Sequence, residues 1–157
     1  MQVFIKKLLS FTTSILLVLT IVIALPITGI NINKNYVAFA QTMTKTGYFS
    51  GMTGTMNSLS GQKSRIFFVS SPTLPSNAQT STVELNVTVS SSSSPFYIYV
   101  IDPSGFRDFA KVSRSGKLIL NNFSGHTPDG KWQIYIESDG FVSTGSARMK
   151  VNYTYQQ

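Results

Sequence analysis

Short segments in which apolar and polar residues alternate are the main feature of the chain after Gln41. From Thr82 to Val89 four apolar side chains alternate with polar ones, and Trp132 to Glu137 repeats the pattern. Residues two apart lie on the same face of an extended strand, so this period of two predicts half-buried β-strands. No window after Gln41 has the 3.6-residue period of an amphipathic helix. The pattern therefore predicts an all-β protein.

Turn-forming residues separate these segments and set the number of strands. Asp102-Pro103-Ser104-Gly105 ends one apolar segment, and Pro128-Asp129-Gly130 precedes the strand of Trp132. Five serines at 90–94 predict a flexible loop. Besides a weak strand near 47–50, the predicted strands are 64–70, 82–89, 96–101, 109–112, 118–120, 132–137 and 147–155. Seven or eight short strands separated by turns are typical of an antiparallel β-sandwich, and we predict a jelly-roll-like one.

The first 40 residues have a composition of their own. Lys6 and Lys7 precede a long, nearly uncharged apolar segment, and Ala38-Phe39-Ala40 forms an A-x-A site ahead of Gln41. This order predicts a secretory signal peptide that is cleaved after Ala40. The length of the apolar segment leaves an uncleaved membrane anchor as the alternative. We expect a signal peptide over 1–40, a Ser/Thr/Gly-rich arm or first strand over 41–62, and the sandwich over 63–157.

Cysteine content and charge narrow the class of protein. The sequence has no cysteine, which argues against a disulfide-framed toxin or growth factor and favours a bacterial exported protein. Three of the 13 Lys and Arg residues precede Gln41, so the exported part has ten basic and six acidic residues and a net charge of +4. This charge favours anionic surfaces but is too small for a nucleic-acid footprint. We expect a secreted protein, free or held at the cell surface, that meets a membrane only during export.

A basic segment is the first candidate for ligand binding. Four cationic residues lie within eleven positions: Arg107, Lys111, Arg114 and Lys117. A hairpin over 109–120 would bring their charges together at one end of the sandwich. Such a patch attracts wall polymers, acidic polysaccharide or anionic lipid, with an affinity that depends on salt. The alternative is an edge hairpin whose charges only prevent pairing between molecules.

Three tyrosines are the second candidate. Tyr97, Tyr99 and Tyr135 alternate with apolar residues that we predict to be core, so they face the other side of their strands. Exposed tyrosines stack on sugar rings or bind a protein partner. The alternative is that they pair across neighbouring strands without a ligand. Trp132 lies on the apolar side of its strand, and we predict it to be core.

Residues for catalysis or metal binding are few. Ser124, His126 and Asp129 have the residue types of a catalytic triad, but they share one loop and lack a G-x-S-x-G turn. We therefore interpret His126 as an exposed loop residue and predict no enzyme activity. Asp102 and Asp108 flank one loop and are the candidates for a Ca²⁺ site, while the alternative is that Asp102 caps a turn. One histidine and no cysteine argue against zinc, and we expect no other cofactor.

Three features of residues 96–157 occur in the order found in a known family. An apolar strand runs into Asp102-Pro103-Ser104-Gly105, then Gly130-Lys131-Trp132 opens an alternating strand, and a strand led by Gly145 ends in two tyrosines. This layout resembles the jelly-roll P-domain of proprotein convertases and of some secreted bacterial proteases, and the related bacterial pre-peptidase C-terminal domain. The resemblance implies a non-catalytic jelly-roll module in the extracellular space.

Together these features predict a secreted, non-catalytic β-sandwich that binds a cell-surface or matrix component. The partner would be a cell-wall or matrix polymer, such as a polyanion or polysaccharide, or an extracellular protein. A different class of function is the alternative, in which the protein assembles through its sheet edges into an extracellular matrix. A role as an enzyme or an enzyme inhibitor has no specific support in the sequence.

Overall fold

The computed structural model describes residues 42–157, which contain nine β-strands and no helix. Within this range no helix is long and apolar enough to cross a membrane. The predicted signal peptide, its cleavage site at Ala38, Ala40 and Gln41, and the alternative membrane anchor lie outside the described residues.

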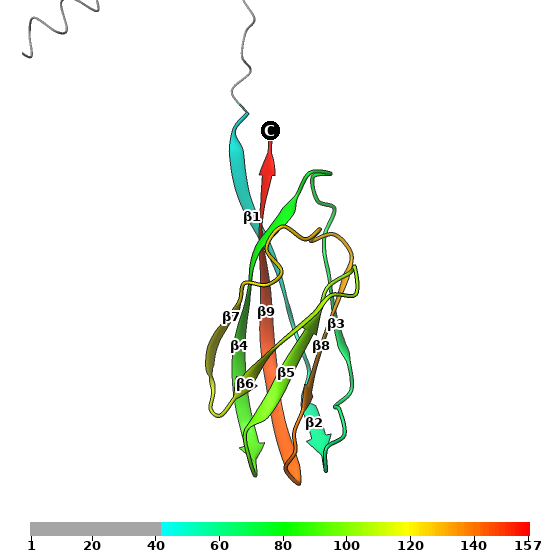
Figure 1. Ribbon diagram of the computed structural model, residues 1–157, viewed down its shortest axis with the longest axis vertical. Coiled ribbons are helices and arrows are strands. Elements are labelled where there is room, and N and C mark those ends of the chain that lie inside the picture. Colours follow the sequence, from blue (N-terminus) through cyan, green and yellow to red (C-terminus); the bar gives the residue numbers. More distant parts are fainter. Residues whose placement is uncertain (1–41) are drawn as a thin grey trace, which may run out of the picture. The chain divides into compact units, whose positions relative to one another are not determined.

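The strands form two antiparallel sheets that pack face to face (Figure 1). In spatial order one sheet contains β1 (Thr44–Met52), β9 (Val142–Gln156), β4 (Gln79–Ser92) and β7 (Gly116–Leu120), and the short β2 (Met56–Leu59) also pairs with β9. The other sheet contains β3 (Phe67–Ser70), β8 (Lys131–Glu137), β5 (Phe96–Ile101) and β6 (Arg107–Val112). The first and last strands are neighbours, and the chain crosses repeatedly between the sheets, as in a jelly roll. The predicted all-β, jelly-roll-like sandwich is confirmed.

The apolar side of each alternating strand fills the space between the sheets. Trp132 is fully buried, as predicted, and packs edge-on against Phe123 with 5.2 Å between ring centroids. Its indole N–H donates a hydrogen bond to the carbonyl oxygen of Pro128 at 2.9 Å, so the one polar group of the ring is satisfied. The buried core extends from Phe49 to Val151. The compact unit Gln41–Gln157 therefore holds a hydrophobic core of its own.

The segment before residue 63 is part of the sandwich. β1 and β2 both pair with β9, and between them Thr53 bonds to Ala147 through its backbone N–H and its side-chain hydroxyl, each at 2.8 Å. Phe49 and Met56 from this segment belong to the core. The segment before residue 63 therefore supplies the first two strands, in line with the first strand that was one alternative for residues 41–62. Its many Ser, Thr and Gly residues leave too few apolar positions to show a clear alternation.

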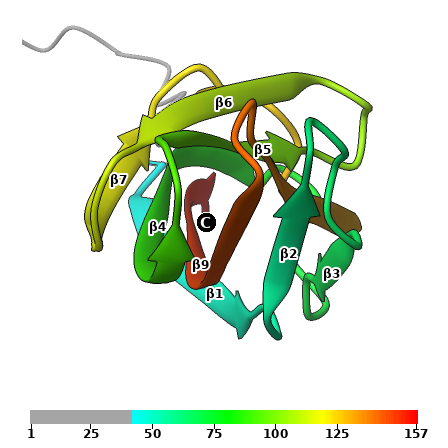
Figure 2. The ribbon, with the colours of Figure 1, turned by 90° about the horizontal axis from the view of Figure 1, so that it is seen from below.

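Two predicted connections differ from the structure. β4 continues through Ser92, which pairs with Ser143 of β9, so most of the predicted serine loop is strand. The hairpin predicted over 109–120 does not form, because β6 pairs with β5 and β7 pairs with β4. The two strands lie along one edge of the sandwich, each in a different sheet (Figure 2). An alternating pattern identifies a strand but not its partner, which explains this error.

Candidate binding face

The outer surface of the β3–β8–β5–β6 sheet brings together most of the predicted binding residues. The antiparallel register places Tyr97 opposite Lys111 and Tyr99 opposite Phe109. On the other side of β5, Tyr99 lies opposite Tyr135 of β8. We call this surface the aromatic face and define it by Lys63, Tyr97, Tyr99, Arg107, Phe109, Lys111 and Tyr135.

The four rings of the aromatic face form one connected cluster. Tyr99 stacks on Tyr135 with 4.9 Å between centroids and 12° between planes, and lies 5.5 Å from Phe109. Phe109 in turn meets Tyr97 edge-on at 5.8 Å. Phe109 is 53% exposed, but Tyr135 is only 5% exposed. Tyr135 thus faces outward as predicted yet is covered by its neighbours, so it supports Tyr99 instead of offering its own ring.

Basic groups border the rings. The guanidinium carbon of Arg107 lies 5.4 Å from the ring centroid of Tyr99, and Nζ of Lys63 lies 5.9 Å from that of Tyr135. Within residues 42–157 neither Arg107 nor Lys111 forms a salt bridge. The outward positions of β5, β6 and β8 include one acidic residue, Glu137, which lies opposite Tyr97. The face therefore has an excess of positive charge that no acidic side chain in the described range pairs with directly.

Tyr99 keeps its hydroxyl proton at neutral pH. Burial is the main cause that raises the pKa of Tyr99, and the nearby charge of Glu137 adds to it. Arg107 acts in the opposite direction but is outweighed. A neutral tyrosine hydroxyl both donates and accepts hydrogen bonds, so Tyr99 is suited to a ligand that carries hydroxyl or carboxylate oxygens.

Arg114 and Lys117 do not join the aromatic face, contrary to the single basic patch that the hairpin implied. Arg114 lies in the turn between β6 and β7. Lys117 lies on the outer surface of the other sheet, where its Nζ is 2.8 Å from Oε2 of Glu84. The hydrogen bond from Lys117 is the main cause that lowers the pKa of Glu84. The four basic residues are therefore divided between two sheets and a turn.

Phe109 and Lys63 were not among the predicted binding residues. Phe109 has a local pattern that identifies it, since Arg107, Phe109 and Lys111 alternate with Asp108, Ala110 and Val112 along β6. Reading this period of two would have placed one aromatic and two basic side chains on the same outer face. Lys63 lies outside the strands, and only the pairing of β3 with β8 brings its segment to Tyr135.

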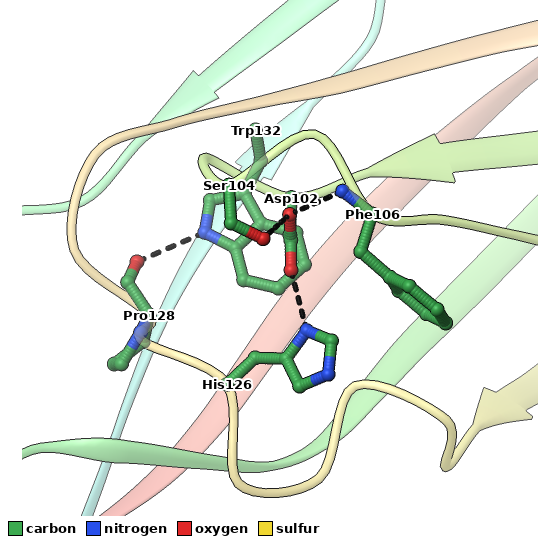
Figure 3. Close-up of polar contacts among 6 residues, drawn as sticks. All are labelled: Asp102, Ser104, Phe106, His126, Pro128 and Trp132. Carbon is green, nitrogen blue, oxygen red and sulfur yellow. Dashed lines mark hydrogen bonds and ion pairs between the residues drawn. The ribbon is translucent and has the colours of Figure 1, made fainter.

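A separate polar cluster joins two loops of the sandwich (Figure 3). The side chain of Asp102 is fully buried and accepts hydrogen bonds from Oγ of Ser104 at 2.6 Å and from the backbone N–H of Phe106 at 2.8 Å. Nδ1 of His126 donates to its second oxygen at 2.7 Å. Burial alone would raise the pKa of Asp102, but these three bonds outweigh it and lower that pKa below its ordinary value. Asp102 thus caps the β5–β6 turn, as one predicted alternative stated.

The residues considered from the sequence for catalysis and for Ca²⁺ binding have other hydrogen-bond partners. His126 contacts Asp102 and not Asp129, whose carboxylate accepts a hydrogen bond from Oγ of Ser71 at 2.7 Å. Asp108 accepts a hydrogen bond from the backbone N–H of its neighbour Phe109. Both oxygens of the buried Asp102 carboxylate accept hydrogen bonds, and a Ca²⁺ site at Asp102 and Asp108 stays a prediction. In the range 42–157 no three His, Cys, Asp or Glu side chains are grouped closely enough to hold a metal.

The outer surface of the β1–β9–β4–β7 sheet has a different character. The side-chain amide of Asn152 donates to Oγ1 of Thr82 at 2.9 Å and to Oε1 of Glu84 at 3.2 Å. Tyr48 is 63% exposed, and Nζ of Lys150 lies 4.5 Å from its ring centroid. A shallow depression between β1, β9 and β4 is lined by these five residues and their neighbours. Its polar groups are largely engaged with one another.

Comparisons with known proteins give no family. No protein-family model and no curated protein matches the chain. Among solved structures, the crystal structure of FlhE aligns with 70% of this chain and 96% of its own, at 13% identity and a TM-score of 0.46. The capsid asymmetric unit of cyanophage Pam1 aligns with 72% of this chain and 85% of its own, at 20% identity and a TM-score of 0.40. The resemblance to the P-domain stays a prediction.

Proposed function

We propose that this protein is a secreted, non-catalytic binding module that attaches to a polymer of the cell surface or matrix through the aromatic face. The observation that carries the proposal is the exposed ring of Phe109 between Arg107 and Lys111 on β6. Clustered exposed aromatic surface is uncommon on a soluble protein and marks interaction sites. A site built on paired strands is held more rigidly than one on loops, so less entropy is lost when a ligand binds.

The proposed role needs no catalytic group, and the polar clusters support this. The titratable pair of Asp102 and His126 ties one loop to another, and the hydroxyl of Ser104 donates to Asp102. A nucleophile in a catalytic triad would instead donate to the histidine. Extracellular location rests on the N-terminal sequence pattern and is part of the proposal.

Binding to isolated bacterial cell walls and to insoluble polysaccharides tests the proposed function. Residues 41–157, which hold their own core, should be retained at low salt and less well at high salt, because salt screens exposed charges. The double variant Tyr97→Ala, Phe109→Ala should lower retention about tenfold. Tyr48→Ala on the opposite sheet is the matched control, since Tyr48 is at least as exposed as Phe109. Equal retention of the wild type and both variants would contradict the proposal.

Assembly into a matrix is the second candidate, favoured by an exposed apolar group beside the edge strand β2. Phe141 is 82% exposed, and its neighbour Val142 pairs with Leu59, which is 54% exposed. Apolar surface next to a sheet edge favours contacts between molecules. Size-exclusion chromatography over a wide concentration range tests this role: assembly requires a size that grows with concentration, and a strict monomer rules it out.

A further inference from the structure

One exposed ring and two cations of the aromatic face alternate along a single edge strand. On β6 the outward side chains are Arg107, Phe109 and Lys111, in that order. Side chains two residues apart on a strand are roughly 7 Å from one another, so a cation lies about that far from Phe109 on either side. Tyr97 and Tyr99 of β5 lie beside Phe109 at centroid distances of 5.8 and 5.5 Å. A ligand that covers Phe109 therefore reaches both cations and a tyrosine hydroxyl.

Most classes of polymer would use only half of this arrangement. A neutral glycan would stack on Phe109 and Tyr97 but leave Arg107 and Lys111 without a counter-charge. An acidic peptide or a polyphosphate would pair with the two cations but leave the exposed ring of Phe109 in water. A polymer of uronic acids offers the apolar face of each sugar ring together with a carboxylate on that ring. Such a polymer uses both kinds of group.

We propose that the aromatic face binds an acidic polysaccharide built of uronic acid units. A sugar ring stacks on Phe109, and carboxylates of the chain pair with Arg107 and Lys111. Glu137 of β8, opposite Tyr97, repels these carboxylates and restricts them to the β6 side of the face. This inference rests on the proposed function and specifies its ligand.

Three soluble polymers separate the contributions of charge and of ring stacking. Polygalacturonate, alginate or hyaluronate supplies both, the same polymer with its carboxyl groups reduced to alcohols supplies only rings, and polyglutamate supplies only charge. Calorimetric titration of residues 41–157 should give about tenfold tighter binding, per repeating unit, to a uronate polymer than to either of the others. Equal affinity for the reduced polymer or for polyglutamate overturns the inference but leaves the proposed function intact.

Variants of matched charge locate the site. Arg107→Gln with Lys111→Gln should remove the preference for the uronate polymer over its reduced form, and Phe109→Ala should weaken uronate binding about tenfold. Arg114→Gln with Lys117→Gln removes the same charge away from the aromatic face and should change the affinity by about twofold or less. Equal losses for the two double variants overturn the inference. Attachment to cell walls without binding to any uronate polymer also overturns it, whereas no binding to walls or polymers contradicts the proposed function as well.

Discussion

The outer surfaces of the two sheets arise from the same alternation but differ in how their charges are used. On the β1–β9–β4–β7 sheet, Glu84 pairs with Lys117 and accepts a hydrogen bond from Asn152. On the other sheet, Arg107 and Lys111 face rings, and within residues 42–157 they have no acidic partner at salt-bridge distance. The β1–β9–β4–β7 sheet has one cation beside an exposed ring, Lys150 over Tyr48, whereas the aromatic face has two cations beside a cluster of four rings. Polar groups that satisfy one another have little to gain from a ligand, and cations beside rings keep their capacity to bind. This difference supports the proposal that the outer surface of the β3–β8–β5–β6 sheet binds the ligand.

The largest expected effect comes from the interior that the two surfaces share. Trp132→Ala should lower the free energy of unfolding by about 3–5 kcal/mol, because it empties a fully buried site and removes the contact with Phe123. Urea denaturation measures this loss, and binding should decline with the folded fraction. Phe109→Ala is the control and should cost less than about 1 kcal/mol, because that ring is half exposed. If both variants lost a similar free energy of unfolding, Phe109 would contribute to stability as much as a residue of the hydrophobic core does.

The loop cluster of Asp102 gives the next effect and a dependence on pH. Asp102→Asn should cost about 1–3 kcal/mol at neutral pH, because a buried carboxylate loses charge-assisted hydrogen bonds. The folded pKa of Asp102 is lowered, so its contribution is complete above the unfolded pKa of about 3.9 and is lost as the pH falls through the folded value. Urea denaturation at a series of pH values should therefore show a flatter acid limb for the variant.

Glu84→Gln is the control for this pH dependence. The pKa of Glu84 is also lowered, mainly by the hydrogen bond from Lys117, but Glu84 lies on the outer surface where solvent screens the pair. The Glu84→Gln variant should keep most of the acid destabilisation of the wild type. If it removes more of that slope than Asp102→Asn does, the surface pair and not the loop cluster governs acid stability.

Exposed apolar residues on the two edge strands test the difference between the surfaces directly. Phe109 of β6 is 53% exposed and Ile119 of β7 is 55% exposed. Phe109→Ala should weaken binding to a uronate polymer about tenfold, and Ile119→Ala should change it by about twofold or less. Both variants should unfold at nearly the wild-type urea concentration. Equal effects on binding would show that the ligand does not distinguish the sheets.

The smallest expected effect sharpens the role of charge pairing. Glu84→Gln leaves Lys117 without its partner, which adds one unpaired positive charge to the β1–β9–β4–β7 surface. Retention on an acidic polymer at low salt should rise about twofold and return to the wild-type value at high salt. A gain that persists at high salt would mean that this surface has a binding site of its own.

The sequence by itself determined where most strands lie and which side chains face outward. The strand predicted at 96–101 has the bounds of β5, and Trp132 lies in the core while Tyr97 and Tyr99 face away from it. These properties are local, because a period of two along an extended chain assigns each side chain to one face whatever the strand pairs with. The same reasoning applied to β6 would have found Phe109.

Only the tertiary structure decided which of these outward residues meet. Arg107 and Lys111 join the tyrosines because β6 pairs with β5, while Lys117 reaches Glu84 because β7 pairs with β4 in the other sheet. His126 reaches Asp102 and not the nearby Asp129 because two loops from different strands close over each other. Pairing of this kind depends on side chains far apart along the chain that fit one core. An alternation within one strand carries no information about that fit.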